Sequence, residues 1–285
     1  MSVATPPATP RIDAHQHVWR LDRGDYGWLG PELNPIYRDF TLGDLRPLLT
    51  EAAIAGTVLV QAAPTVAETE YLLRIANESD SLVRGVVGWV DMAAADAVST
   101  LARLARDPLL KSVRPMLQDL PDSDWILRPE VDAVLTALPA LGLRFDALVK
   151  PAQLPAVLRM LDRHPDLAVV IDHGAKPPIA SEELQPWAQL IATVAGHPHV
   201  HCKLSGLVTE AGPEWTEDRL APCVDHLLAC FGPMRLLWGS DWPVVNLGGG
   251  YVRWLAATNA LLAGLAVDER AAIMGGNARR FYGLS

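Results

Sequence analysis

The feature that most constrains the fold of this chain is a series of eight short apolar runs rich in Val, Leu and Ile. Amphipathic helical stretches lie between most of them, such as 68–77, where Thr65 and Glu68 predict a capping box. Strands that alternate with helices indicate a parallel sheet, because parallel neighbours need a crossover connection. The predicted strands lie near residues 11–18, 57–63, 83–91, 110–117, 143–150, 167–173, 200–206 and 235–241.

Eight strand–helix units predict a (β/α)8 barrel, whose usual length is about 250 residues. The alternative is an open, doubly wound sheet. That fold favours a Gly-rich turn after the first strand, and here the first strand continues into His15-Gln16-His17. No linker-like change of composition and no repeat of 20–50 residues is evident in the 285 residues. We therefore predict a loose, Pro-rich tail over residues 1–10 and a single barrel domain over 11–285.

Composition excludes several classes of protein. A net charge of −9 without any basic run argues against a nucleic-acid partner. No apolar run approaches the roughly 18–20 residues of a membrane helix, and the first ten residues lack the features of a signal peptide. Cys202, Cys223 and Cys230 have no metal-type spacing and are typical of reduced thiols. We predict a cytoplasmic enzyme or binding protein, and a homo-oligomer is compatible with the sequence.

Polar residues interrupt the apolar strands where a barrel enzyme carries its chemistry, at the carboxyl ends. Asp13, His15 and His17 share one face of the first strand by alternation. His173 ends the sixth strand and Asp241 the eighth. Three imidazoles and a carboxylate at one barrel mouth suit zinc chemistry or general-base hydrolysis. The alternative is a pair of buried histidines that serve only the core.

Further polar residues are expected around this group. Alternation in the seventh strand turns Lys203 toward the barrel interior, and the alternative is a surface lysine. Arg114 is the best candidate for holding a substrate oxygen, because guanidinium is a fixed fork of donors. Tryptophans near the barrel mouth favour a carbohydrate-like ligand, although some of the nine in the chain are expected to fill the core. The candidate substrate-binding residues are Trp28, Gln61, Trp89, Arg114 and Lys150.

These motifs resemble the amidohydrolase superfamily, and more closely its sugar-lactonase branch, which includes L-fuconolactonases and L-rhamnono-lactonases. The superfamily motifs are Asp13-Ala14-His15-Gln16-His17, Asp172-His173-Gly174, Gly239-Ser240-Asp241-Trp242-Pro243 and Asn277-Ala278-Arg279-Arg280-Phe281-Tyr282-Gly283. The branch motifs are Asp25-Tyr26-Gly27-Trp28-Leu29, Val60-Gln61-Ala62, Gly88-Trp89-Val90-Asp91, Val149-Lys150-Pro151 and Lys203-Leu204-Ser205-Gly206-Leu207. Together they cover nearly the whole chain after the tail.

The resemblance implies a (β/α)8 fold, hydrolysis of a sugar lactone, and a metal-binding role for His15, His17, His173 and Asp241. Binuclear members of the superfamily carry a bridging lysine or glutamate after the fourth strand, and here Arg114 follows it. The sequence therefore argues against two metal ions. One divalent ion, with zinc as the first candidate, and a metal-independent enzyme both remain open.

The predicted reaction is addition of water to a lactone carbonyl, with Asp241 as general base and later general acid. His173 and Lys203 are the other predicted catalytic residues. The histidines polarise the carbonyl directly or through one divalent ion. Two alternatives stay open: a metal-dependent decarboxylase on the same barrel, and a non-catalytic sugar-binding barrel.

Overall fold

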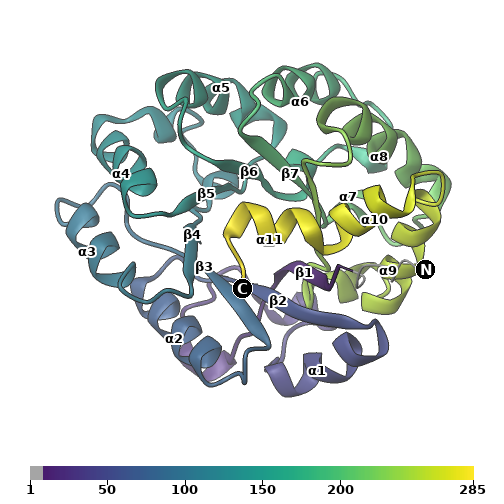
Figure 1. Ribbon diagram of the computed structural model, residues 1–285, viewed down its shortest axis with the longest axis horizontal. Coiled ribbons are helices and arrows are strands. Elements are labelled where there is room, and N and C mark those ends of the chain that lie inside the picture. Colours follow the sequence, from purple (N-terminus) through teal and green to yellow (C-terminus); the bar gives the residue numbers. More distant parts are fainter. Residues whose placement is uncertain (1–8) are drawn as a thin grey trace, which may run out of the picture.

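The structure is a computed structural model that describes residues 9–285 (Figure 1). Its eight strands form one sheet in chain order, and each pairs in parallel with the next. The prediction of a (β/α)8 barrel is thereby confirmed. The strands are β1 (Arg11–Gln16), β2 (Ile54–Val60), β3 (Val83–Gly88), β4 (Leu110–Val113), β5 (Arg144–Ala147), β6 (Val169–Ile171), β7 (Val200–Leu204) and β8 (Leu236–Trp238).

Every strand ends earlier than the sequence predicted; β4, for example, ends at Val113 and not at residue 117. The residues beyond the strand ends carry the polar side chains of the barrel mouth and have already left the sheet. β2 begins at Ile54, three residues earlier than predicted. The predicted tail over residues 1–10 lies, except for its last two residues, outside the described part of the chain.

Helices surround the barrel, and their apolar faces pack on the outward side of the strands (Figure 1). Among the described residues, no helix is long and apolar enough to cross a membrane. The helices are α1 (Leu42–Glu51), α2 (Val66–Asn77), α3 (Ala97–Leu104), α4 (Pro129–Ala140), α5 (Leu154–Arg163), α6 (Trp187–Ala195), α7 (Leu207–Ala211), α8 (Glu217–Phe231), α9 (Tyr251–Leu261), α10 (Val267–Ala271) and α11 (Asn277–Tyr282).

The predicted capping box of α2 is only half right. Thr65 caps the helix as expected, since its hydroxyl accepts from the N–H of Glu68, and the helix begins at Val66. The Glu68 side chain does not return to Thr65. It is fully buried, where it accepts hydrogen bonds from the Tyr26 hydroxyl at 2.9 Å and from the N–H of Ala62. Glu68 thus ties the loop after β1 to the loop after β2, both at the barrel mouth.

The barrel interior is filled at its amino end by small and branched side chains. Ile12, Ala14, Val58, Val60, Val87, Val170 and Leu237 form one buried cluster with residues of α11. Figure 1 shows α11 lying across the ring of strands on this side. Since this end is closed, ligands can enter only from the carboxyl ends of the strands.

The barrel closes between β1 and β8 by two backbone hydrogen bonds. The N–H of Asp241 donates to the carbonyl of His15 at 2.8 Å, and the N–H of His17 donates to the carbonyl of Trp242 at 2.7 Å. The first and last strands are more than 200 positions apart in the chain, but their ends therefore lie side by side. This closure brings Asp241 next to the two histidines of β1.

His201 of β7 makes the stability of the fold depend on pH. Its ring lies 4.8 Å from that of Phe281 in α11, and burial lowers its pKa to about 4. Below pH 6.5, His201 takes up a proton in the unfolded chain, whereas in the folded chain it stays neutral down to about pH 4. The free energy of unfolding therefore decreases as the pH is lowered from 6.5 to 4. At pH 5 this one group should contribute up to about 2 kcal/mol of the loss. We predict that His201→Leu shows a smaller drop in urea midpoint between pH 7 and pH 5 than the wild type. An equal drop in both proteins would contradict the assignment.

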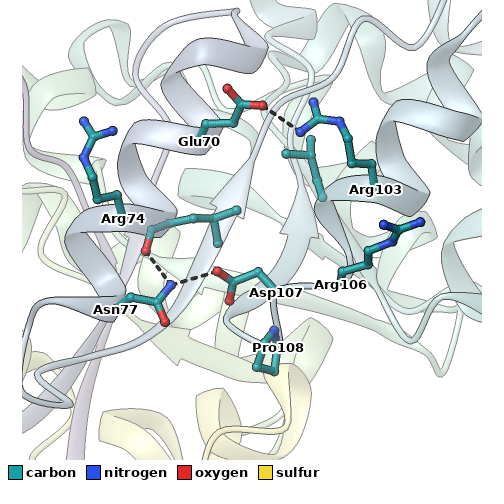
Figure 2. A pocket seen from close by; sticks show the side chains of 9 residues that line it. Glu70, Arg74, Asn77, Arg103, Arg106, Asp107 and Pro108 are labelled. Carbon is teal, nitrogen blue, oxygen red and sulfur yellow. Dashed lines mark hydrogen bonds and ion pairs between the residues drawn. The ribbon is translucent and has the colours of Figure 1, made fainter.

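A shallow hollow lies on the outer surface between α2 and α3 (Figure 2). Arg103 pairs with Glu70 across it at 2.7 Å, and the Asn77 amide donates to Asp107 at 2.8 Å. Asp107 precedes β4, so the hollow reaches the amino ends of the strands. It is therefore separate from the polar residues at the opposite end of the barrel.

Candidate active site

His15, His17, His173 and Asp241 meet at the carboxyl ends of the strands, and each is at most 4% exposed. One carboxylate oxygen, Oδ1 of Asp241, lies 3.3 Å from Nε2 of His17, 3.6 Å from Nε2 of His15 and 3.9 Å from Nε2 of His173. The Nε2 atoms of His15 and His17 are 3.2 Å apart. The four side chains that the sequence predicted to converge thus surround one point.

Two of these residues adopt a backbone conformation that is rare for non-glycine residues. His173 has φ +53° and Asp241 has φ +59°, both in the left-handed region. Such strain persists only where the surrounding structure enforces it, and it is concentrated at functional sites. The backbone hydrogen bond from Asp241 to His15 is one of the contacts that enforce it here.

The imidazoles are oriented by partners on their other ring nitrogen. Nδ1 of His17 lies 2.8 Å from the carbonyl of Val60, and Nδ1 of His173 lies 2.9 Å from the hydroxyl of Ser205. A carbonyl can only accept, so His17 carries its proton on Nδ1. Its Nε2 faces Oδ1 of Asp241 at 3.3 Å. Similar partners are typical of histidines that bind metal ions.

Asp13, predicted to share one face of the strand with His15 and His17, contacts the backbone near the group. The pairing of β1 with β2 shifts between Asp13 and Gln16, which breaks the alternation. The Asp13 carboxylate instead accepts from the backbone N–H groups of His15 and Ser240, at 3.2 and 2.9 Å. Asp13 therefore supports the backbone of both functional strands.

The electrostatics of the site favour an ionised Asp241 beside His15 and His173, two imidazoles with lowered pKa values. Burial acts to raise the pKa of Asp241, but the neighbouring His173, His17 and His15 hold it well below its usual range. Burial lowers the pKa of His173 to about 4. Burial and the ammonium of Lys203 lower the pKa of His15 well below its ordinary value. At neutral pH, Asp241 is thus a free acceptor of a proton.

Lys203 lies directly beneath this group and is fully buried in the barrel interior. Its Nζ is 3.0 Å from Nδ1 of His15 and 2.5 Å from Oδ2 of Asp146, both within hydrogen-bonding geometry. It is also 2.9 Å from Oδ1 of Asp172, an ion pair whose direction is unsuitable for a hydrogen bond. Alternation in β7 placed Lys203 correctly inside the barrel, but it contacts His15 and does not line the cavity.

The sequence analysis gave no role to the two carboxylates beside Lys203. Asp146 accepts further hydrogen bonds from Ser112 at 2.6 Å and from the Tyr282 hydroxyl at 2.7 Å. The sequence did contain a signal for Asp146, because this charged residue interrupts the apolar run of residues 145–149. Asp172 was part of a recognised motif, but nothing in the sequence separates its role from that of its neighbour His173.

Arg114, which follows β4, connects this buried layer to the cavity. Its Nη1 lies 3.2 Å from Oδ2 of Asp172, and its Nη2 lies 3.0 Å from Oε1 of Gln61. Gln61 donates in return to the carbonyl of Arg114 at 3.0 Å. Gln61 is fully buried and holds Arg114 in place; it does not line the cavity.

A cavity of about 290 Å³ opens onto Asp241, His17 and His173. Trp28 forms part of its wall, and its indole N–H donates to the carbonyl of Ala62 at 2.7 Å. Trp89 and Lys150 are not among the described residues that line it. Lys150 is exposed where the chain turns toward α5, and Trp89 is half-buried after β3. The lining residues are His17, Trp28, Leu33, Ala62, Arg114, Met116, Gln118, Asp119, Leu148, His173, Lys176, Asp241, Val244 and Leu247.

The site also has the chemistry of a metal centre. Ligand atoms of His15, His173 and Asp241 all lie within 4.8 Å of one another, and the Nε2 of His17 is nearby. Imidazole and carboxylate are ligands that zinc accepts. Directly after β4 the chain continues into Arg114, whose guanidinium has no acceptor atom and cannot bridge two ions.

A (β/α)8 barrel with imidazoles and a carboxylate at the carboxyl ends of its strands defines a class of barrel hydrolases. A sequence model described as Amidohydrolase matches residues 12–284. The chain belongs to the amidohydrolase family. The predicted resemblance to this family, and the prediction that the chain is a hydrolase, are confirmed.

Along nearly its whole length the chain is similar to two L-fucono-1,5-lactonases and to an amidohydrolase of known structure. It is 49% identical to an L-fucono-1,5-lactonase of Burkholderia ambifaria over 278 residues, which is 96% of each chain. It is 36% identical to an L-fucono-1,5-lactonase of Burkholderia multivorans, again over 96% of each chain. A crystal structure of an amidohydrolase from Burkholderia multivorans with bound Zn superimposes with a TM-score of 0.92, at 35% identity, covering 97% of this chain and 100% of that one.

Proposed function

We propose that this enzyme hydrolyses a sugar-derived lactone, L-fucono-1,5-lactone in the first instance, to the open hydroxy acid. The observation that carries the proposal is the ionised Asp241 on the cavity wall, ringed by three imidazoles. The two curated relatives named L-fucono-1,5-lactonase support the choice of substrate.

Asp241 takes a proton from water as the water oxygen adds to the lactone carbonyl. It later returns that proton to the ring oxygen as the C–O bond of the lactone breaks, so it acts first as a base and then as an acid. Charge that develops on the carbonyl oxygen is stabilised by N–H donors of the histidine group and by the guanidinium of Arg114. His173 and Asp241 line the cavity and are the catalytic residues that contact substrate.

The cavity offers a neutral polyol two kinds of surface. Trp28, Leu33, Met116 and other apolar side chains provide contact for C–H faces. Gln118, Asp119 and Lys176 can exchange hydrogen bonds with hydroxyls. A metal-dependent decarboxylase would need a free cation to bind the carboxylate of its substrate, whereas Arg114 already forms an ion pair with Asp172. A protein that only binds a sugar would gain nothing from Asp241, whose backbone is held in a strained conformation.

His15, His17, His173 and Asp241 would hold a single divalent ion, with zinc as the first candidate. Such an ion would polarise the carbonyl as a Lewis acid when bound.

The proposal of a cytoplasmic enzyme rests on three cysteines that are all free. The small-molecule lactone is the partner we propose, and we assign no oligomeric state.

We predict at most one tightly bound divalent ion per chain. Two ions at such a site need a bridging ligand, and the residue that directly follows β4 is Arg114, which cannot bridge them. The measurement is elemental analysis of untagged protein purified in metal-free buffer and again after zinc loading and desalting. Two equivalents of metal retained after desalting would contradict the prediction.

The proposed function is tested by proton release from L-fucono-, L-xylono- and L-rhamnono-lactones, with and without a chelator. Because lactones also open spontaneously, the background is measured in the same buffer without protein. The expected result is a rate well above that background for at least one of the three lactones. If none exceeds the background in either buffer, or with added zinc, the proposed function is wrong.

A further inference from the structure

We propose that Glu68 is a positioning residue for substrate binding, which fixes the indole of Trp28 as a wall of the cavity. Glu68 is not among the described residues that line the cavity, so it acts through the segments that it holds. That the bound molecule is a lactone rests on the proposed function. The anchoring of Trp28 does not.

Trp28 is the largest apolar surface in the cavity wall, and it is only half-buried. Its indole N–H donates to the carbonyl of Ala62 at 2.7 Å. Its ring packs in T-shaped geometry against the fully buried Trp19, with 5.5 Å between the ring centroids. A ring that is already held in its binding position loses less conformational entropy when a ligand packs against it. The fixed indole therefore favours binding.

One carboxyl group holds the chain on both sides of the hydrogen bond between Trp28 and Ala62. Oε1 of Glu68 accepts from the N–H of Ala62 at 3.3 Å. Oε2 of Glu68 accepts at 2.9 Å from the hydroxyl of Tyr26, two residues before Trp28. Glu68 and Tyr26 are both buried. Glu68 thus fixes the donor segment and the acceptor segment relative to each other.

The segment that precedes this contact is tied to the first two turns of α2 as well. The guanidinium of Arg23 lies 4.2 Å from the centroid of the Tyr71 ring and 3.4 Å from Oε2 of Glu68. Asp25 accepts from Arg23 at 2.6 Å and lies 3.4 Å from the hydroxyl of Thr65, which caps α2. The loop after β1 is therefore attached to α2 by several polar contacts close together.

The helix that carries Glu68 is itself fixed to the barrel. Thr69 accepts from the N–H of Trp89 at 2.7 Å and donates to the carbonyl of Trp89 at 2.8 Å, directly after β3. A buried acidic group is weak evidence for a role in stability, because apolar side chains of similar size often stabilise a fold equally well. The direction of both Glu68 oxygens toward the Trp28–Ala62 contact favours a role in binding.

The first test is Tyr26→Phe, which removes one hydrogen bond to Glu68 and leaves the one to Ala62. We expect KM for the lactone that the wild type hydrolyses best to rise by about threefold to tenfold, the scale of one hydrogen bond, with kcat within about threefold. The matched control is Tyr37→Phe, which removes a hydroxyl from an exposed tyrosine of the same loop and should leave both constants unchanged.

A double-mutant cycle with Trp28→Phe separates positioning from loop stability. If Glu68 acts through the indole, Tyr26→Phe should change KM by less than about twofold once Trp28→Phe is present. A purely structural role predicts the same factor in both backgrounds. Three results overturn the proposal: a KM factor that recurs in the Trp28→Phe background, a rise in KM below about threefold for Tyr26→Phe alone, or a larger fall in kcat than in affinity.

A second measurement needs no lactone. The 1H–15N correlation spectrum of protein labelled with 15N-tryptophan shows the indole N–H signals, and Trp28→Phe assigns the signal of Trp28. We expect this proton to exchange with water at least about threefold faster in Tyr26→Phe than in the wild type, and at the wild-type rate in Tyr37→Phe. A smaller increase in Tyr26→Phe overturns the proposal.

Thermal melting establishes that each variant is folded. If Trp28→Phe does not fold, Trp28→Tyr takes its place in both experiments. Absence of turnover by the wild type would contradict the proposed lactonase function alone, because the exchange rate of the Trp28 indole proton would still decide whether Tyr26 and Glu68 anchor it.

Discussion

Replacing Asp241 by Asn should leave a folded barrel whose kcat/KM for L-fucono-1,5-lactone is at least about 100-fold lower than that of the wild type. This is the usual scale for loss of a general base. The amide is nearly isosteric with the carboxylate, so the contacts with the three imidazoles keep their distances. It cannot take the proton from water, and that is the step assigned to Asp241.

The control for this experiment is Asp119→Asn, which neutralises another carboxylate of the same cavity. Among the contacts of the described residues, no hydrogen bond or ion pair joins Asp119 to the three histidines, so we expect its effect to fall mainly on KM. Thermal melting establishes that both variants fold. Turnover by Asp241→Asn within about threefold of the wild type would remove Asp241 from the mechanism.

Much of this site could be predicted from the sequence because a barrel converts strand periodicity into position. Once eight parallel strands are recognised, their carboxyl ends must meet, and polar residues there must converge. His173, Asp241 and Arg114 follow from this rule. Alternation in β7 predicts that Lys203 faces the barrel interior. Its burial beneath His15 could not be predicted, because it depends on the ion pair with Asp146, a residue of another strand.

The same rule failed where the backbone departs from regular geometry. The pairing of β1 is irregular beyond Asp13, whose carboxylate accepts from the backbone N–H groups of His15 and Ser240. Lys150 and Trp89 follow strand ends, but the chain turns them away from the cavity. Gln118, Asp119 and Lys176 belong to loops after β4 and β6, and their place in the cavity wall depends on tertiary contacts. No periodic pattern in the sequence reports such contacts.

The different surroundings of His15 and His17 lie beyond sequence reasoning for another reason. The two are the same residue type near the same strand, and only their partners across the barrel distinguish them. Nδ1 of His17 lies 2.8 Å from the carbonyl of Val60, and Nδ1 of His15 lies 3.0 Å from Nζ of Lys203. Both partners lie more than 40 positions away in the chain from the histidine that they contact. The difference between the two histidines therefore arises only in the folded protein.

Neutral sugar lactones should be hydrolysed with a kcat/KM at least about 100-fold higher than that for a pyrone dicarboxylate. Each carboxylate that enters a desolvated pocket without a partner costs several kcal/mol, and about 1.4 kcal/mol corresponds to a factor of ten. Among residues 9–285, Arg114 and Lys176 are the Arg and Lys side chains that line the cavity, and each already contacts a carboxylate. Arg114 lies 3.2 Å from Asp172, and Lys176 lies 2.7 Å from Glu210.

The remaining charges in the cavity also oppose a dianion. Asp119 and Asp241 both line it, and the net charge of −9 repels anions at long range. A neutral lactone meets none of these costs, since its hydroxyls can bind Gln118, Asp119 and Lys176. The comparison uses L-fucono-, L-xylono- and L-rhamnono-lactones against a pyrone dicarboxylate at matched ionic strength. If the pyrone dicarboxylate is the better substrate, Arg114 and Lys176 must leave their acidic partners to bind it, and the assignment to neutral lactones is wrong.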